Sequence, residues 1–324
     1  MRNRRLGRTA LKVSELCLGT MNFGPNTTEA DSFELLDHAL DNDIDFVDTA
    51  DQYGGSLGVG ATETIIGNWL GQGGGRRERI VLATKLYEPM SDRPNDRGLS
   101  ARHIRLACDA SLRRLQTDHI DLYYVHRWDE TTPIEETLRG LDDLVRMGKV
   151  RYVGASDFAA WQLAKANLLA DVRGWSPFAV IQSHYHMLER QVEQEVLPYC
   201  QAHGVGFVPY FPLAGGFLTG KYKRGEAAPT GSRGASSSYV QEYMTAANYD
   251  TVDKLTAWAA ARERGLNELA QAWLMAQPQV CSVISGATKL AHVESNVKAA
   301  DWELTSDELA EIGAILDSKE TVNS

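Results

Sequence analysis

Four side chains that can carry or transfer protons follow three strand-like runs in the first half of the chain. The segment DFVDTADQYG starts as a buried strand and then turns polar, which places Asp48 and Tyr53 beyond its apolar residues. The apolar run IVLATKL carries Lys85 near its end, and the run IDLYYVHR carries His126. An unpaired ammonium inside an apolar strand is strongly disfavoured, so we expect an acid close to Lys85.

An acid, a tyrosine, a lysine and a histidine together form a set that can transfer protons. Each alone has an ordinary explanation, as a helix cap, a satisfied core residue or a residue on the rim of a sheet. In a fold that alternates strands and helices, polar residues at successive strand ends gather on one face. We therefore predict one site that contains Asp48, Tyr53, Lys85 and His126.

Composition and charge narrow the class of protein. The chain has 324 residues, of which 43% are hydrophobic and 23% charged, and its net charge is 33 − 43 = −10. An acidic chain is repelled by a phosphate backbone, which argues against general nucleic-acid binding. No apolar run approaches the ~20 residues of a membrane span. We see no linker or break in composition, so residues 1–324 are predicted to form one domain.

The cysteines indicate the compartment. Cys17, Cys108, Cys200 and Cys281 are far apart and form no CxxC pair. The arginine-rich N-terminus lacks the apolar core that a signal peptide needs. We expect reduced thiols and a soluble cytoplasmic protein.

Strand-like and helix-like runs alternate along the chain. Between the third and fourth strands, apolar residues from Ile104 to Leu115 follow helical spacing, and those from Ile134 to Val145 do so after the fourth. Strict alternation means a parallel sheet, and eight units favour a closed (β/α)8 TIM barrel of about 250 residues plus additions. The predicted strands are Glu15 to Gly19, Asp45 to Thr49, Ile80 to Lys85, Asp121 to His126, Arg151 to Ala155, Ala179 to Ser183, Gly206 to Tyr210 and Ser282 to Ser285.

Three segments depart from this alternation. Residues 1–13 read as a β-hairpin that closes the bottom of the barrel, and extra helices are expected between the seventh and eighth barrel strands and at the C-terminus. Residues 214–247 are rich in Gly, Ser and Pro and are a candidate lid, or else a solvated surface loop. Thr305 to Glu308 forms a capping box that starts the terminal helix. The candidate lid contains four basic residues: Lys221, Lys223, Arg224 and Arg233.

Several catalytic motifs are missing from the sequence. No GxGxxG follows the first strand, and neither HExxH nor GxSxG occurs. His184 and His186 place two imidazoles on one side of a strand end, which is a possible pair of metal ligands. A barrel metallohydrolase is therefore an alternative. It also needs HxH on an early strand and an acid on the last strand, and the last strand, SVISGAT, offers no acid.

The chain resembles the aldo-keto reductases from end to end. The order and spacing of the matching segments make the resemblance specific, and the last two resemble the branch that contains voltage-gated potassium channel β subunits and many bacterial reductases. That resemblance implies a (β/α) barrel that binds a nicotinamide cofactor without a Rossmann fold. The segments are LGRTALKVSELCLGTMNFG at 6–24, FVDTADQYG, IVLATKL, IDLYYVH, VRYVGAS, PLAGGFLTGKY at 212–222 and VISGATKLAHVESN at 283–296.

The resemblance gives each member of the catalytic tetrad a role. Hydride from the nicotinamide reduces a carbonyl carbon, and Tyr53 donates the proton that the developing alkoxide needs. A neighbouring cation favours the phenolate, so Lys85 is expected to lower the pKa of Tyr53 from its usual value near 10. Asp48 is the expected partner of the ammonium, and His126 is expected to hydrogen-bond the carbonyl oxygen.

The resemblance also implies the residues that hold the nicotinamide end of the cofactor. Ser156, Asp157 and Gln182 match positions that bind the carboxamide, and Tyr210 matches the aromatic residue that stacks on the ring. Asp157 stands where the family usually has Asn, and an ionised Asp accepts hydrogen bonds but cannot donate them. Phe211 likewise replaces a usual Ser.

The remaining cofactor positions indicate NADP(H), with NAD(H) left open. Arg233 and Lys289 are expected to flank the adenosine and supply charged donors to a 2′-phosphate. His292 stands where Arg or Gln is common, which leaves the choice between the two cofactors open. The other implied contacts are Thr20, Met21, Asp48, Leu213, Gly215, Lys221, Gly286, Thr288 and Asn296.

The sequence thus predicts an NADP(H)-dependent oxidoreductase of the EC 1.1.1 class that reduces aldehydes or ketones to alcohols and requires no metal. Its partners are expected to be a small carbonyl or alcohol substrate, with neither nucleic acid nor membrane; the oligomeric state is open. Another possibility is a cofactor-binding regulatory subunit with slow turnover. The aromatic residues Phe23, Tyr87, Trp128 and Phe211, beside Tyr53 and His126, are candidates for a substrate pocket, although core packing explains them nearly as well.

Overall fold

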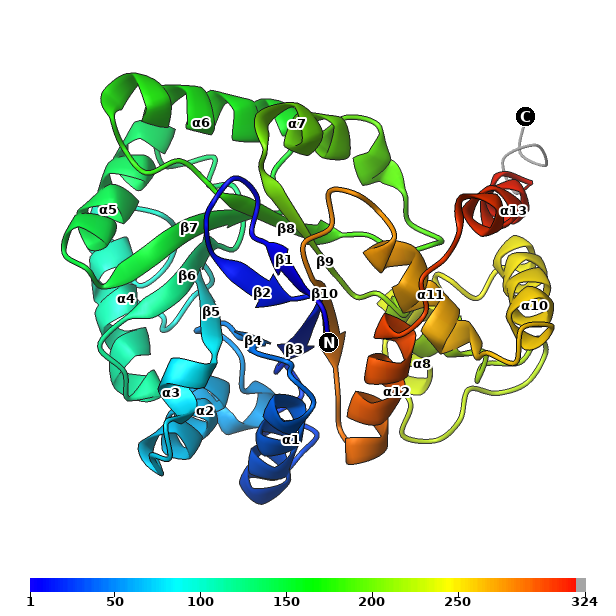
Figure 1. Cartoon of the computed structure of the whole chain (residues 1–324). Coiled ribbons are helices and arrows are strands. Elements are labelled where there is room, and N and C mark those ends of the chain that lie inside the picture. Colours follow the sequence, from blue (N-terminus) through cyan, green and yellow to red (C-terminus); the bar gives the residue numbers. More distant parts are fainter. Residues whose placement is uncertain (319–324) are drawn as a thin grey trace.

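Eight parallel strands pair side by side in one sheet, in the order β10-β3-β4-β5-β6-β7-β8-β9 (Figure 1). The computed structural model describes residues 1–318. Each predicted strand is present, with its bounds shifted by no more than a residue or so at either end. The strands are β3 (Leu16–Gly19), β4 (Phe46–Asp48), β5 (Val81–Leu86), β6 (Ile120–Val125), β7 (Val150–Ser156), β8 (Val180–His184), β9 (Gly206–Tyr210) and β10 (Val283–Gly286).

The sheet closes into a barrel because β9, at one edge, pairs with the residues that directly precede β10, at the other edge. The Phe207 amide donates to the Gln279 carbonyl at 3.1 Å, and the Cys281 amide donates to the Phe207 carbonyl at 2.8 Å. These bonds satisfy edge groups that an open sheet would leave exposed. The predicted (β/α)8 barrel is thereby confirmed.

Helices surround the barrel and pack their apolar sides against it (Figure 1). The two helices predicted from periodicity are present as α4 and α5, and the four buried cysteines are free thiols. The helices are α1 (Glu29–Asp41), α2 (Ala61–Gly71), α3 (Arg76–Arg79), α4 (Ala101–Leu115), α5 (Ile134–Arg146), α6 (Ala160–Arg173), α7 (Val196–His203), α8 (Arg233–Ser236), α9 (Ser238–Gln241), α10 (Ala246–Ala260), α11 (Leu266–Met275), α12 (Leu290–Ala300) and α13 (Ser306–Asp317), with 3-10 turns η1 (Gly55–Leu57), η2 (Gln191–Glu193) and η3 (Ala214–Thr219).

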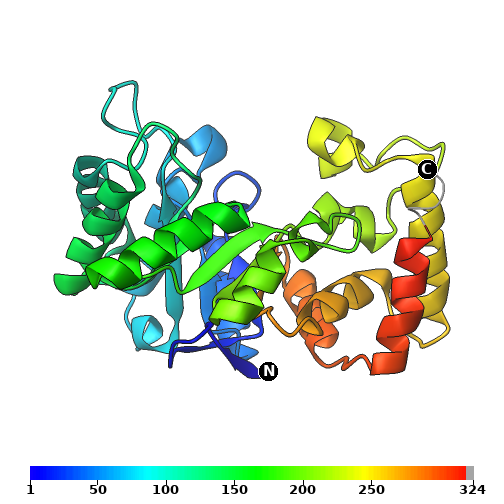
Figure 2. The same cartoon turned by 90° about the horizontal axis from the view of Figure 1, so that it is seen from above.

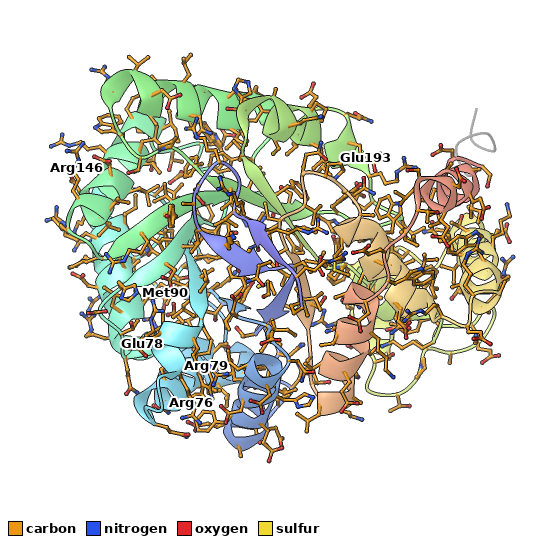
Figure 3. The ribbon with its side chains drawn as sticks, viewed as in Figure 1. Arg76, Glu78, Arg79, Met90, Arg146 and Glu193 are labelled. Carbon is orange, nitrogen blue, oxygen red and sulfur yellow. The ribbon has the colours of Figure 1, made fainter. Side chains whose placement is uncertain are left out.

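Charged side chains lie on the outward faces of the helices. Arg146, on α5, pairs with Asp142 one turn earlier, and Glu193 pairs with Arg190; Figure 3 labels Arg146 and Glu193 on the outer rim. These faces are polar because the opposite faces supply the core. Within residues 1–318, no helix is both long and apolar enough to cross a membrane.

The extra helices lie where the sequence predicts them. Residues 214–247 fold into η3, α8 and α9 between β9 and β10, followed by α10 and α11. Thr305 caps α13 with the predicted box, accepting from the Glu308 amide at 3.2 Å. Figures 1 and 2 both show α13 beside α10, where the Trp258 indole donates to Glu311 at 2.7 Å.

The N-terminal hairpin closes the lower end of the barrel, as predicted. Strands β1 (Asn3–Arg5) and β2 (Lys12–Ser14) pair antiparallel, and Figure 2 shows them at the lower edge of the barrel. Leu6 and Val13 are fully buried and join the apolar cluster inside the barrel. Gly7 fits between the starts of β8 and β9, because a Cβ there would lie 2.5 Å from the Gly206 nitrogen.

Gly7→Ala is expected to destabilise the fold more than the same change at Gly73. Both glycines have a left-handed backbone, with φ of 58° and 74°, but no atom lies within 4 Å of a Cβ built at Gly73. The left-handed backbone costs about 1–2 kcal/mol at either position. Overpacking adds roughly 1–3 kcal/mol at Gly7 alone. Urea unfolding of both variants measures the difference. Equal losses in the free energy of unfolding would contradict close packing between the N-terminal hairpin and the bottom of the barrel.

Candidate active site

The period of a β-strand explains why the predicted tetrad converges. Phe46, Ala83 and Tyr124 point into the barrel, where they belong to the inner apolar cluster. Successive side chains of a strand alternate between faces, so the residue two positions later points to the same side. That residue is Asp48 on β4, Lys85 on β5, and His126 just beyond the end of β6. The inner face is thus apolar below and polar at the carboxyl ends of the strands.

Lys85 has the acid partner that the sequence requires. The Lys85 ammonium is fully buried and donates to Asp48 Oδ1 at 2.5 Å and to the Thr49 carbonyl at 2.8 Å. It also lies 3.5 Å from the Tyr53 hydroxyl. The ring of His126 stands edge-on to that of Tyr53, with 6.2 Å between centroids. The structure therefore brings all four predicted residues together.

The acidity of Tyr53 differs from the sequence-based expectation. Burial raises the pKa of the Tyr53 phenol above its ordinary value, and this effect exceeds the opposing effect of Lys85. Asp48 also raises this pKa, because its carboxylate offsets the lysine charge. Tyr53 is therefore protonated at neutral pH, which is the state that a proton donor needs.

Lys85 and His126 differ in charge state. Burial lowers the pKa of Lys85, but the charges of Asp48 and Tyr53 and their hydrogen bonds outweigh burial and raise it overall, so the ammonium is charged. Burial, reinforced by Lys85 and Arg127, lowers the pKa of His126 to about 3. The imidazole is therefore neutral at pH 7, and its Nδ1 has no hydrogen-bond partner among residues 1–318.

Gln182 is part of the tetrad network, which sequence reasoning missed. Its side-chain amide donates to Asp48 Oδ2 at 2.9 Å across the barrel. The sequence assigned Gln182 only to the cofactor, and the alternation of β8 could have shown that it points inward. Thr20, another predicted cofactor residue, also contacts the tetrad. Its hydroxyl donates to the backbone carbonyl of Asp48 at 2.9 Å.

The residues predicted to hold the nicotinamide lie at the ends of β7, β8 and β9. Ser156 is buried, whereas Asp157 is exposed and has a left-handed backbone with φ of 52°. The Tyr210 hydroxyl donates to Asp157 Oδ2 at 3.2 Å. Phe211 follows with a left-handed backbone, with φ of 61°, and its ring stands edge-on to that of His184, with 5.6 Å between centroids.

The two histidines considered as metal ligands belong to an aromatic cluster. His184 stacks on Tyr210 with 5.4 Å between centroids, and its Nδ1 lies 2.9 Å from the Tyr239 hydroxyl. His186 Nδ1 accepts from the Leu188 amide at 3.2 Å. No group of three or more metal-binding side chains occurs in the part of the chain that the structure describes.

A group of basic residues lies between the ends of β3 and β10 and the segment after β9. Arg233, on α8, is partly buried and donates to Asn22 Oδ1 at 2.8 Å. Lys221 and Lys289 both act on the imidazole of His292, whose pKa is lowered first by burial and then by these two charges. Across the described residues, none of these four basic side chains has a carboxylate within salt-bridge distance. A cationic site without acidic partners fits a phosphate-bearing ligand.

The other predicted cofactor residues differ in how far they are accessible. Met21 and Gly286 are exposed, whereas Leu213, Gly215 and Thr288 are partly exposed. Asn296 is buried, and its Oδ1 accepts from Gln271 at 3.1 Å. Asn22, which the prediction omitted, joins the cluster because it is the partner of Arg233.

The predicted substrate pocket needs one correction. Phe23 is fully buried in the core between barrel and helices, so it has no surface to offer to a substrate. Tyr87 and Trp128 are partly exposed near the tetrad strands, and Trp128 packs edge-on against Phe158 and Trp161.

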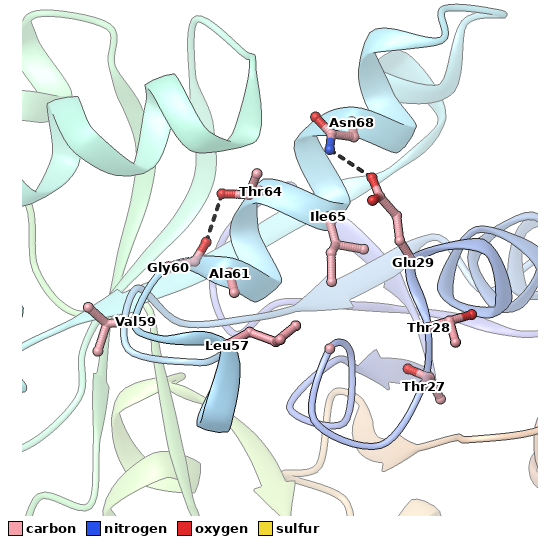
Figure 4. Close-up of a pocket in the computed structure, with 11 residues that line it drawn as sticks. Thr27, Thr28, Glu29, Leu57, Val59, Gly60, Ala61, Thr64, Ile65 and Asn68 are labelled. Carbon is pink, nitrogen blue, oxygen red and sulfur yellow. Dashed lines mark hydrogen bonds between the residues drawn. The ribbon is translucent and has the colours of Figure 1, made fainter.

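A separate pocket of about 440 Å³ lies on the flank of the barrel (Figure 4). The loop before α1, the end of η1 with the residues after it, and the first turns of α2 form it, and the Asn68 side chain donates a hydrogen bond of 2.7 Å to Glu29. None of the four tetrad residues lines it. We therefore place the candidate active site at the tetrad and not in this pocket.

Comparison with known proteins agrees with the fold. Residues 15–317 match the family model described as the Aldo/keto reductase family. The chain belongs to this family and is an oxidoreductase by that membership.

Three relatives place it in the branch expected from the sequence. An uncharacterized oxidoreductase, YrpG, of Bacillus subtilis is 44% identical over 314 residues, covering 93% of this chain and 92% of that protein. A probable voltage-gated potassium channel subunit beta of Arabidopsis thaliana is 37% identical, covering 93% and 92%. Norsolorinic acid reductase A of Aspergillus parasiticus is 35% identical, covering 93% of this chain and 77% of that protein.

Asp48→Asn is expected to destabilise the protein by roughly 3–5 kcal/mol, because it leaves the Lys85 ammonium buried without a counter-charge. Adding Lys85→Met should restore much of that loss, since the double variant buries no unpaired charge. Chemical denaturation of the wild type, the two single variants and the double variant at pH 7 tests this. A double variant less stable than Asp48→Asn would show that the ion pair is not what governs the stability of this region.

Proposed function

We propose that the protein reduces aldehydes or ketones to alcohols with NADP(H), and that Tyr53 is the proton donor. The observation that carries this proposal is a phenol whose hydroxyl lies 3.5 Å from a buried ammonium, at the carboxyl end of a barrel. When bound, the nicotinamide supplies the hydride. The chain itself supplies the proton, the charge stabilisation and the orientation of the substrate.

Lys85 makes Tyr53 a better donor in the transition state than in the resting state. As the phenolic proton leaves, negative charge develops on the Tyr53 oxygen beside the ammonium, in surroundings of low dielectric. Asp48 and the Thr49 carbonyl fix the ammonium in position. The lysine therefore stabilises a charge that exists only while the proton is being transferred.

His126 is suited to orient the carbonyl group. Its imidazole is neutral, so it donates one hydrogen bond without competing for the proton of Tyr53. The edge-on contact with the Tyr53 ring keeps both groups on one side of the barrel mouth. A carbonyl oxygen bound by both donors presents its carbon toward the remaining open side.

The chain's own residues support cofactor binding at two places. Ser156, Asp157 and Gln182 would hold the carboxamide end, and Tyr210 offers a ring for stacking. Arg233 and Lys289 would hold the 2′-phosphate, which favours NADP(H) over NAD(H). The cluster of basic groups without acidic partners supports this assignment.

A second candidate function is a cofactor-binding subunit with slow turnover. It is favoured by the 37% identity to a probable potassium channel subunit beta. Steady-state rates with a broad panel of aldehydes and ketones separate the two candidates, because a regulatory subunit would bind the cofactor and turn over slowly with every substrate.

Tyr53→Phe is expected to lower carbonyl reduction by at least about a hundredfold, because general acid catalysis contributes 10²–10⁴. The ring is retained, so cofactor affinity measured by fluorescence titration should stay near that of the wild type. Tyr152→Phe is the matched control, since it removes a hydroxyl from a partly buried tyrosine on β7 outside the tetrad. Near-normal turnover of Tyr53→Phe would refute the assigned role.

Arg233→Ala is expected to weaken NADPH binding about ten- to a hundredfold, because a hydrogen bond to a charged group is worth roughly 1.5–3 kcal/mol. NADH lacks the 2′-phosphate and should bind nearly as before. Arg224→Ala is the control within the same segment, since Arg224 pairs with Asp250 instead. Equal losses for both cofactors would mean that Arg233 serves the pyrophosphate or the position of α8.

A further inference from the structure

Asp157 is a carboxylate at the reaction centre that the proposed proton transfer does not use. It follows the last residue of β7, and its backbone amide donates to the Gln182 carbonyl at 2.9 Å. Its Oδ2 accepts a hydrogen bond from the Tyr210 hydroxyl at 3.2 Å. No lysine, arginine or histidine within residues 1–318 forms a salt bridge with it. The carboxylate is thus anchored but not neutralised.

The groups around Asp157 come from several strands of the barrel. The pKa of Asp157 is raised overall, because desolvation by the surrounding protein exceeds the opposing effects of the Tyr210 hydrogen bond, Arg127, a His184 backbone hydrogen bond and Lys85. Tyr210 lies on β9, Arg127 follows β6 and Lys85 lies on β5. The side chain is exposed to solvent, and the hydroxyl donor and the two cations nearby favour its ionised form.

The charge of Asp157 reaches the space where the cofactor ring must lie. Its carboxylate is bonded to the hydroxyl of Tyr210, whose ring is proposed to stack on the nicotinamide, and its amide is bonded to Gln182, whose side chain holds Asp48 of the tetrad. A nicotinamide that delivers hydride to a carbonyl held by Tyr53 must lie within a few ångströms of that hydroxyl. A carboxylate held between Tyr210 and Gln182 therefore lies near that ring, and its charge also acts on Tyr53.

We propose that Asp157 makes the site selective for the oxidation state of the cofactor, binding the oxidised nicotinamide more tightly than the reduced one. This inference rests on the proposed function. The oxidised ring carries a positive charge that the reduced ring lacks, so a nearby carboxylate stabilises only the oxidised form. Selective stabilisation of the product form of the cofactor favours carbonyl reduction over alcohol oxidation among the bound species.

An asparagine at this position cannot have the same effect, because its amide is neutral. Asparagine nevertheless has nearly the same shape and tolerates the left-handed backbone that Asp157 adopts. It can also accept the Tyr210 hydrogen bond through its carbonyl oxygen. Asp157→Asn therefore removes the charge while keeping the fold and the contact.

The test is isothermal titration of the wild type and Asp157→Asn with NADP+ and NADPH at pH 7.5. Asp157→Asn should weaken NADP+ binding about tenfold and change NADPH binding less than about threefold, since opposite charges a few ångströms apart in a partly exposed site are worth a change of this size. The NAD+ and NADH pair should show the same ratio, because the ring is the same. Asp118→Asn, an exposed aspartate before β6, controls for the loss of one negative charge from the whole protein.

Three outcomes would overturn the inference in distinguishable ways. Equal weakening of both oxidation states would mean that Asp157 only positions the cofactor. Unchanged binding of both would mean that its carboxyl is neutral in the complex. If neither dinucleotide binds even to the wild type, the proposed function fails, and this inference fails with it.

Discussion

The buried ammonium of Lys85 is the constraint on which the rest of the site depends. A charge in the interior of a barrel is tolerated only with close partners, and Asp48 and the Thr49 carbonyl supply them from the neighbouring strand. Gln182 then fixes the second oxygen of Asp48 from the far side of the barrel. The ion pair thus joins strands that are distant in sequence and determines where Tyr53 meets a positive charge.

Burial and pairing together favour the protonated form of Tyr53, the proposed proton donor. Burial alone would favour the neutral form of Lys85, and Lys85 by itself lowers the pKa of Tyr53. Asp48 opposes both effects, and burial of the phenol contributes most to the raised pKa of Tyr53. His126 differs from Lys85 because it lies beside cations and has no carboxylate that outweighs its burial, so its imidazole is neutral. The site therefore contains a protonated phenol, which is the proposed proton donor, and a neutral imidazole, which is the proposed orienting group.

The sequence by itself determined the strands, the helices and the identity of the tetrad. These features depend on local periodicity, because a residue two positions beyond an inward apolar residue points inward as well. The same logic identified α4, α5 and the cap of α13, whose signals lie within a few residues. The order and spacing of the motifs also predicted the family, and residues 15–317 match the model of that family.

Only the tertiary structure decided the interactions that depend on how the barrel closes. The bond between Gln182 and Asp48 joins residues 134 positions apart, and the contact of Arg233 with Asn22 joins residues 211 apart. No local pattern encodes such pairs, because they require a particular strand order and curvature. The direction of the pKa shift of Tyr53 was mispredicted for the same reason. It is the balance between burial and two opposite charges, and burial is a property of the whole packed barrel.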